Sequence, residues 1–85
     1  MKLKLVYFAW LRDKIGTCEE QVETPTEVTT VSDLIGWLSE RSAQYKDAFA
    51  DMNTVRCAIN LDYVQIDAKL NDGDEVGFFP PVTGG

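Results

Sequence analysis

The residues whose types could do chemistry stand at the end of the sequence, which closes with Pro-Pro-Val-Thr-Gly-Gly at residues 80–85. A glycine carboxylate is a poor electrophile, but transfer of AMP from ATP would convert it to an acyl adenylate that a sulfur or amine nucleophile can attack. Side-chain bulk at the last residue would obstruct that attack, and glycine has none. Gly85 is therefore the candidate reactive residue, although termini tolerate small residues and a Gly-Gly ending also arises by chance.

The two prolines before this ending predict that the chain leaves its domain there. Pro80 and Pro81 lack an amide hydrogen and fix φ at about −65°, which stops sheet pairing and stiffens the exit. The next four residues can extend roughly 13 Å and could thread into the active site of another protein. We therefore expect a folded domain of residues 1–81 and a flexible tail of residues 82–85. The residues that give passage ahead of the last glycine are Val82, Thr83 and Gly84.

The rest of the sequence offers no catalytic apparatus of its own. It has no histidine, no nucleophile elbow and no phosphate-binding glycine loop. Cys18 and Cys57 lack metal-ligand spacing, and we expect two small buried hydrophobes in preference to a disulfide. Asp72, Asp74 and Glu75 lack the further ligands of a calcium loop, so a solvated turn is favoured over a metal site. No stably bound cofactor is expected, and the chain would act as a co-substrate.

Length and charge narrow the class of partner. Eighty-five residues support one domain. Fourteen acidic residues against eight basic ones give a net charge of −6, which disfavours nucleic acid and anionic membrane surfaces and favours docking on another protein. No apolar run approaches the roughly 20 residues that span a bilayer. We expect a cytoplasmic protein.

The first half of the chain predicts two strands and a helix. Residues 2–9 alternate as a strand, residues 11–15 form one helical turn closed by a glycine, and residues 18–24 form a polar edge strand. Thr30 and Asp33 have the spacing of a capping box, so a helix starts there. Its apolar face at offsets of three, four and seven consists of Val31, Leu34, Ile35 and Leu38, with Trp37 beside it.

The second half predicts three more strands. A weak helical spacing at residues 45–49 and a loop at residues 51–54 precede strands at residues 55–60, 63–66 and 75–79. A strong turn signal at residues 71–74 introduces the last strand. The element order predicts an α+β fold of the β-grasp type, a mixed sheet packed on one main helix. The first and last strands, which are the most apolar, should be central neighbours.

Phe78 and Phe79 close the last predicted strand. Alternation sends their side chains to opposite faces, so one is expected in the core and the other at a partner contact that also includes Pro80 and Pro81. Burial of both rings in the core is the more conservative alternative.

Residues 72–76 and 78–85 closely resemble the C-terminal end of the small subunits of molybdopterin synthase, which are ubiquitin-like proteins. The resemblance extends to the overall length, while residues 18–54 are similar only in pattern. The matching positions near the start are Tyr7, Phe8, Ala9, Leu11, Arg12 and Gly16.

This resemblance implies a carrier of activated sulfur. In that family an E1-like adenylyltransferase consumes ATP to adenylate the terminal glycine, which becomes a thiocarboxylate. The tail then inserts into the large synthase subunit and donates sulfur to cyclic pyranopterin monophosphate, building the dithiolene of molybdopterin. Carried over to this sequence, Gly85 bears the sulfur covalently and Gly84 gives passage. The implied partners are the activating enzyme and the large subunit, the latter in a heterotetramer.

Three other functions share parts of this pattern. A sulfur carrier of another pathway, such as thiamine biosynthesis, has the same ending, although residues 79–83 favour the molybdopterin branch. A ubiquitin-like modifier would form isopeptide bonds through the same activated intermediate. A plain interaction module would bind its partners equally well without the tail.

Overall fold

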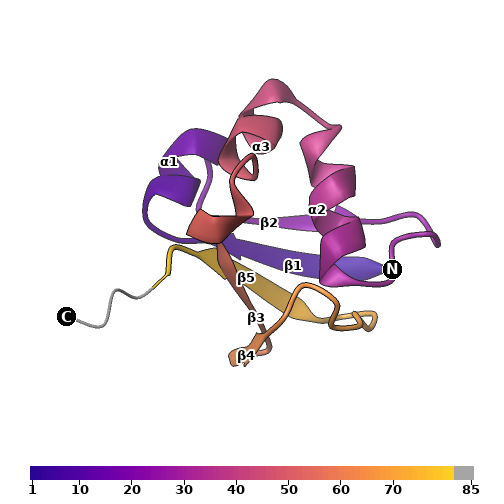
Figure 1. Ribbon diagram of the computed structural model, residues 1–85. Helices are drawn as coiled ribbons and strands as arrows, with labels where there is room; N and C mark the ends of the chain where they lie inside the picture. The colour runs from indigo at the N-terminus through magenta and orange to yellow at the C-terminus, as the bar shows by residue number, and fades with distance from the viewer. Residues whose placement is uncertain (82–85) are drawn as a thin grey trace.

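The computed structural model describes residues 1–81, which form a five-stranded sheet with three α-helices on one of its faces (Figure 1). The predicted flexible tail of residues 82–85 lies outside the described residues. The elements in chain order are β1 (Lys2–Tyr7), α1 (Trp10–Ile15), β2 (Glu19–Glu23), α2 (Val31–Ser39), α3 (Ala43–Ala48), the 3-10 helix η1 (Met52–Thr54), β3 (Arg56–Ile59), β4 (Asp62–Val64) and β5 (Glu75–Phe79).

The two most apolar strands lie at the centre of the sheet, as the sequence predicts. The strand order is β2-β1-β5-β3-β4. β1 and β5 are parallel, with Leu5 opposite Val76 and Tyr7 opposite Phe78, whereas the other pairs are antiparallel. A parallel pair needs a long crossover, and the segment that carries α2 and α3 supplies it. The mixed sheet with its covering helices confirms the β-grasp prediction.

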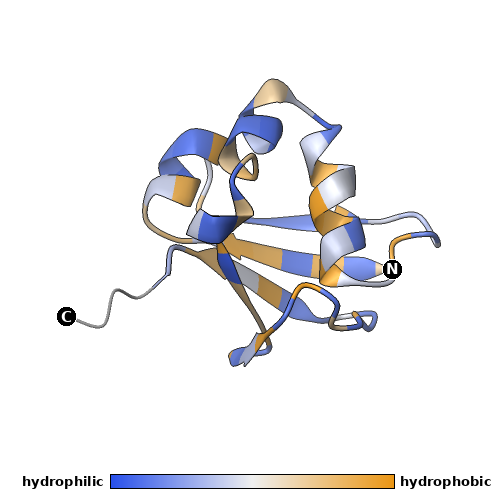
Figure 2. Ribbon diagram, viewed as in Figure 1, coloured by the Kyte–Doolittle hydropathy of each residue, from blue (hydrophilic) through white to orange (hydrophobic). Residues whose placement is uncertain are grey.

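The core lies between the sheet and the helices. Alternate residues of the central strands point toward it, and the apolar stripe of α2 packs with them. Figure 2 shows the apolar residues along α2 and the central strands. Each such side chain contributes about 1.5–3 kcal/mol when removed from water. The largest fully buried side chains are Tyr7, Phe78, Leu5, Leu11, Leu34, Leu38, Val31 and Val76.

Helix α2 begins with the predicted capping box. The Thr30 hydroxyl accepts a hydrogen bond from the Asp33 amide at 3.1 Å, and the Asp33 carboxylate accepts one from the Thr30 amide at the same distance. The Asp33 carboxylate also accepts bonds from the amide and hydroxyl of Thr29. These bonds, led by the one from the Thr29 amide, lower the pKa of Asp33.

Several element boundaries differ from the sequence prediction. The first strand ends at Tyr7 instead of residue 9, because Ala9 has φ of 55° and turns the chain into α1. The segment predicted as a loop at residues 51–54 contains η1, where the Asp51 carboxylate caps the Asn53 amide at 3.0 Å. The predicted helical turn at residues 11–15 is α1 and the weak helical spacing at residues 45–49 lies in and after α3, and both helices share the sheet face with α2.

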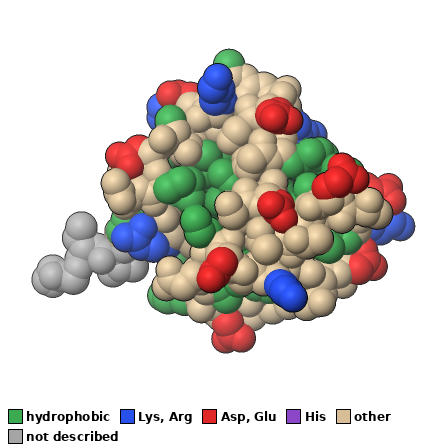
Figure 3. All heavy atoms as spheres, turned by 45° about the vertical axis from the view of Figure 1, so that its right-hand side comes forward, with side chains coloured by type: hydrophobic (Ala, Val, Ile, Leu, Met, Phe, Trp, Pro, Cys, Tyr) green, Lys and Arg blue, Asp and Glu red, His purple; other side chains and the backbone are tan. Residues whose placement is uncertain are grey.

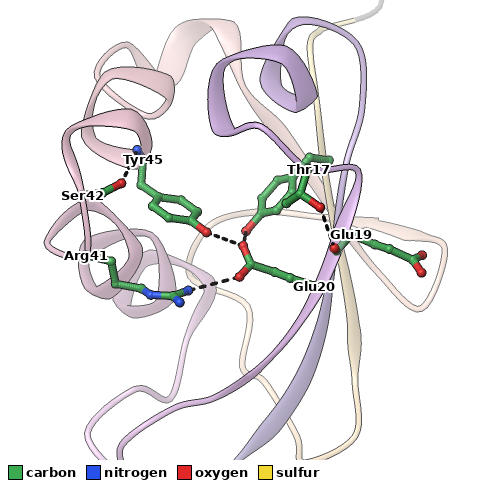
Figure 4. A network of polar contacts seen from close by, with 7 residues as sticks. Thr17, Glu19, Glu20, Arg41, Ser42 and Tyr45 are labelled. Atoms are coloured by element: carbon green, nitrogen blue, oxygen red, sulfur yellow. Dashed lines mark hydrogen bonds and ion pairs between the residues drawn. The ribbon is translucent and has the colours of Figure 1, made fainter.

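A polar network ties the helical layer to the edge of the sheet (Figure 4). The Glu20 carboxylate, on β2, accepts hydrogen bonds from the hydroxyls of Tyr7 and Tyr45 and pairs with Arg41 at 3.3 Å. The Arg41 guanidinium lies 5.1 Å from the centre of the Trp37 ring and 5.2 Å from that of Tyr45. One carboxylate on the edge strand thus joins β1, α3 and the turn after α2.

We predict that this network makes the fold sensitive to alkali. Burial, followed by the hydrogen bond to Glu20, raises the pKa of Tyr45 to about 12, and burial raises the pKa of Tyr7 well above its usual range. An unfolded tyrosine ionises near about pH 10. The stabilisation is therefore complete below about pH 10 and is lost as the pH rises toward about 12.

The measurement is the free energy of unfolding in urea at several pH values between about 8 and 12. Tyr45→Phe should lose less stability over this range than the wild type, whereas Tyr63→Phe, on the other side of the sheet, should follow the wild type. Parallel curves for the wild type and Tyr45→Phe would contradict the prediction.

Candidate functional site

The site begins where β5 ends and the chain turns toward its last residues. Phe78 is fully buried, with its ring stacked 6.0 Å from that of Tyr7 and edge-on to that of Phe49 at 5.0 Å. Phe79 points to the opposite face, where its ring centre lies 5.2 Å from that of Tyr63. The predicted division of the two phenylalanines is confirmed. Burial of both in the core is wrong, and the Phe78 ring has no surface to offer a partner.

An apolar hollow of about 390 Å³ lies on the sheet face that carries no helices. Its rim includes large apolar side chains that remain in water, since Phe8 is 49%, Tyr63 77% and Leu61 85% exposed. A small domain rarely leaves such side chains together on its surface unless they meet another molecule. The lining residues of this apolar hollow are Val6, Phe8, Ala58, Leu61, Tyr63, Glu75, Gly77, Phe79 and Pro80.

One lining residue of the apolar hollow, Gly77, has no side chain. Gly77 sits in the middle of β5, and a Cβ placed on it would lie 3.4 Å from Cε2 of Phe8. The Phe8 ring therefore lies over Gly77, and a Cβ there would only come into ordinary van der Waals contact with it. The hollow is open on one side to a partner and is continuous with Pro80, the first residue after β5.

The open sheet face carries charged side chains at both ends of its strands. At the end away from the tail, Lys4 forms ion pairs of 3.6 Å with both Glu19 and Glu75. At the tail end, Arg56 lies opposite Phe79 in the β3–β5 pairing. Acidic side chains are scattered over the surface shown in Figure 3, with apolar surface visible between them, in keeping with the net charge of −6.

The structure locates part of the predicted site. Pro80 borders the apolar hollow and Pro81 follows it, half-exposed. Val82, Thr83, Gly84 and Gly85 fall outside the described residues. The sequence interpretation missed Phe8, Leu61 and Tyr63 as surface residues, although apolar residues on both faces of the first strand were a signal that its second face also carries apolar surface.

The structure also places the cysteines and the acidic turn that the sequence analysis considered. Cys57 is buried as predicted, but Cys18 is exposed, so its expected burial is wrong. Asp74 is likewise buried instead of solvated, and its carboxylate accepts hydrogen bonds from the Asn60 side chain at 2.9 Å and the Asn71 amide at 2.8 Å. Within residues 1–81, no group of three potential ligands is arranged to hold a metal ion. None of the helices in that part of the chain is long and apolar enough to cross a membrane.

Comparison with known families shows which family the chain belongs to. A model of the ThiS family matches residues 5–85, which include the glycines at the end of the sequence. The chain belongs to the ThiS family. This membership agrees with the β-grasp fold, and the family model extends to the last residue, Gly85.

Relatives of this ThiS-family chain include molybdopterin synthase sulfur carrier subunits. The Escherichia coli protein of that name is 37% identical over 83 residues, covering 98% of this chain and 99% of the relative. The Chlamydomonas reinhardtii protein of the same name is 36% identical over 87 residues, with both chains fully covered. The resemblance seen at both ends of the sequence is therefore confirmed over its whole length.

Solved structures share the fold of this ThiS-family chain. A Pyrococcus furiosus protein, provisionally named molybdopterin converting factor subunit 1, superposes with a TM-score of 0.79 at 39% identity, covering 96% of this chain and 99% of its own. Small archaeal modifier proteins share the fold as well.

We predict that the cysteines of this ThiS-family chain are dispensable for the chemistry of its C-terminus. Burial raises the pKa of the Cys57 thiol, which disfavours the reactive thiolate, and Cys18 lies in the loop before β2. The double variant Cys18→Ala, Cys57→Ala should fold and accept sulfur as the wild type does, checked by circular dichroism and by the intact mass after activation. A folded double variant that accepts no sulfur would contradict this.

Proposed function

We propose that this chain is the sulfur-carrier subunit of a molybdopterin synthase. The observation that carries the proposal is the match to the family and to named sulfur carrier subunits along the whole chain, through to Gly85. The fold supports it, because β5 delivers the end of the chain from the middle of a rigid sheet. The protein would work in the cytoplasm, together with a partner that supplies the catalytic groups.

The reactive atom would be the carboxyl carbon of Gly85. An E1-like enzyme would transfer AMP from ATP to this carboxylate with release of pyrophosphate, and a sulfur nucleophile would then displace AMP to leave a thiocarboxylate. The chain holds no ATP and no stable cofactor in this scheme, since the nucleotide is bound by the activating enzyme. Gly84, without a Cβ, would let the end of the chain pass through a narrow entrance, with Thr83 and Val82 behind it.

The receiving partner would be the large synthase subunit, which would bind the pterin substrate. A Helicobacter pylori protein that shares the fold was solved as a complex of subunits 1 and 2 of a molybdopterin converting factor, with a TM-score of 0.67, 21% identity and full coverage of both chains. That likeness supports the fold, and the pairing of two subunits is a fact about that protein. We propose a corresponding heterotetramer for this chain.

The apolar hollow would be the docking surface for this large subunit. Residues 82–85 span roughly 13 Å when extended, so a protein that receives Gly85 must approach the end of β5 closely. The hollow borders Pro80 at that end, and docking would remove Phe8, Tyr63 and Phe79 from water. A central apolar contact with a polar rim is the usual anatomy of such an interface.

Two rivals remain separable by experiment. A modifier would produce ladders of conjugates in cell extracts, because its glycine forms isopeptide bonds with lysines, and the fold shared with small archaeal modifier proteins makes this test worthwhile. A carrier for thiamine biosynthesis would support sulfur transfer to a thiazole precursor in place of molybdopterin.

The central prediction concerns the length of the tail. Deleting Gly85, or adding one residue after it, should abolish sulfur transfer, because a displacement of the reacting atom by about 1 Å can lower the rate roughly 100-fold. The free energy of unfolding should barely change, since both prolines separate this end from the sheet. Wild type and variants are incubated with ATP, the activating enzyme and a sulfur donor, and the intact protein is weighed.

Wild-type protein should gain the mass difference of one oxygen exchanged for sulfur, and the variants should not. Cys18→Ala serves as the matched control, because it alters an exposed residue far along the chain from the tail. A shortened variant that gains the same mass and still yields molybdopterin would refute the role of Gly85.

We also predict that docking on the large subunit depends more on apolar contact than on charge. Phe79→Ala should raise the dissociation constant about tenfold or more. Raising the salt concentration from about 0.05 M to about 0.5 M should raise the dissociation constant by a smaller factor, because salt screens the steering charges and leaves the apolar hollow intact. Calorimetry measures both effects, with Ile66→Ala as the control outside the hollow. A salt effect larger than the effect of Phe79→Ala would overturn this view.

A further inference from the structure

Leu61 occupies an unfavourable position at the tip of the β3–β4 hairpin. Ile59 pairs with Asp62, so Asn60 and Leu61 form a two-residue turn. Their φ values are 50° and 74°, and the Leu61 side chain is 85% exposed. A large apolar residue thus combines left-handed backbone with nearly complete exposure to water.

Both properties disfavour leucine for physical reasons. Positive φ at both loop residues is the pattern of a type I′ turn, in which Asn-Gly is strongly preferred because glycine has no Cβ to clash with the backbone. Asn60 fits its place, since its side-chain amide donates a hydrogen bond to the Asp74 carboxylate and accepts one from the Glu75 amide at 3.0 Å. Leu61 does not fit, and at 85% exposure it gains little from packing within its own domain. Strained residues of this kind gather at functional sites.

The surroundings of Leu61 indicate what its side chain is for. It borders the apolar hollow together with Phe8 and Tyr63, and the same hollow reaches Pro80 at the start of the tail. The hairpin tip therefore extends the apolar surface on the side away from the helices. A leucine that projects from a rigid two-residue turn can enter a recess on a partner with little loss of backbone freedom.

We propose that Leu61 is an affinity-determining contact for the protein that receives the tail, held in a strained turn so that it projects beyond the apolar hollow. The inference rests on the proposed function, in which that protein is the large synthase subunit. The tail favours this partner, because the protein that receives Gly85 must lie against Pro80, which lines the hollow. Leu61 borders the same hollow at its other end, beside Glu75, so a partner that covers the whole hollow also reaches Leu61. The matching surface on the partner is an apolar recess.

The test exploits opposite effects of one substitution on folding and on docking. Leu61→Gly relieves the left-handed strain, so the melting temperature of the isolated chain should rise by roughly 4 °C. The same substitution should weaken binding to the large subunit about tenfold. Leu61→Met keeps an apolar chain of similar volume, so it should match the wild type in both measurements. Ile66→Ser, an exposed apolar residue that does not line the hollow, is the matched control for loss of surface apolarity.

Calorimetry with the purified large subunit and thermal melts of the chain alone give the two readouts. If Leu61→Gly binds the large subunit with wild-type affinity, Leu61 is not an affinity-determining contact. If Leu61→Gly melts at a lower temperature than the wild type, the turn at Leu61 is not strained. A wild-type chain that does not bind the large subunit would overturn the proposed function as well, whereas normal wild-type binding with an unaffected Leu61→Gly variant removes this inference alone. Self-association of the isolated chain that Leu61→Gly abolishes would show a second copy as the occupant and overturn the choice of partner.

Discussion

The parallel pairing of β1 with β5 is the constraint on which the rest of the structure depends. Because the two strands run in the same direction, the chain between them must cross from one end of the sheet to the other, and α2 and α3 occupy that crossover. The carboxyl ends of both strands then meet at one edge of the sheet. Phe8, which follows β1, therefore lies near Phe79, which ends β5, and Pro80 follows at the same end of the sheet.

The two faces of this sheet carry different tasks. One is covered by helices and holds the core, in which Phe78 packs against Tyr7 and Phe49. The other is open and carries the apolar hollow, which extends from Pro80 to Leu61 and Glu75, and Lys4 forms ion pairs with Glu75 and Glu19 beside it. The alternation of side chains along β5 serves both faces, since Phe78 anchors the strand in the core and Phe79, its neighbour, lines the apolar hollow.

The sequence was sufficient for the fold where local signals agree with one another. The capping box of Thr30, the apolar period of α2 and the two most apolar strands each have a short-range cause, and each was found as predicted. Burial depends on three-dimensional neighbours, and there the prediction was weaker. Cys18 is exposed and Asp74 is buried, the reverse of what was expected. Burial of Asp74 relies on hydrogen bonds donated by Asn60 and Asn71, which the local sequence pattern does not reveal. The apolar hollow could not be predicted either, since its rim is assembled from four strands and two turns.

The central place of β5 has a mechanical consequence. A tail attached to an edge strand could be peeled away one hydrogen bond at a time by a partner that grips it. Here β5 is bonded on both sides, to β1 and to β3, so a pull along the tail acts in shear on two rows of hydrogen bonds at once. The bonds must then yield together, which demands far more force than peeling. In the proposed function, this pairing would let a partner hold the domain by its last residues and release it again without unravelling β5.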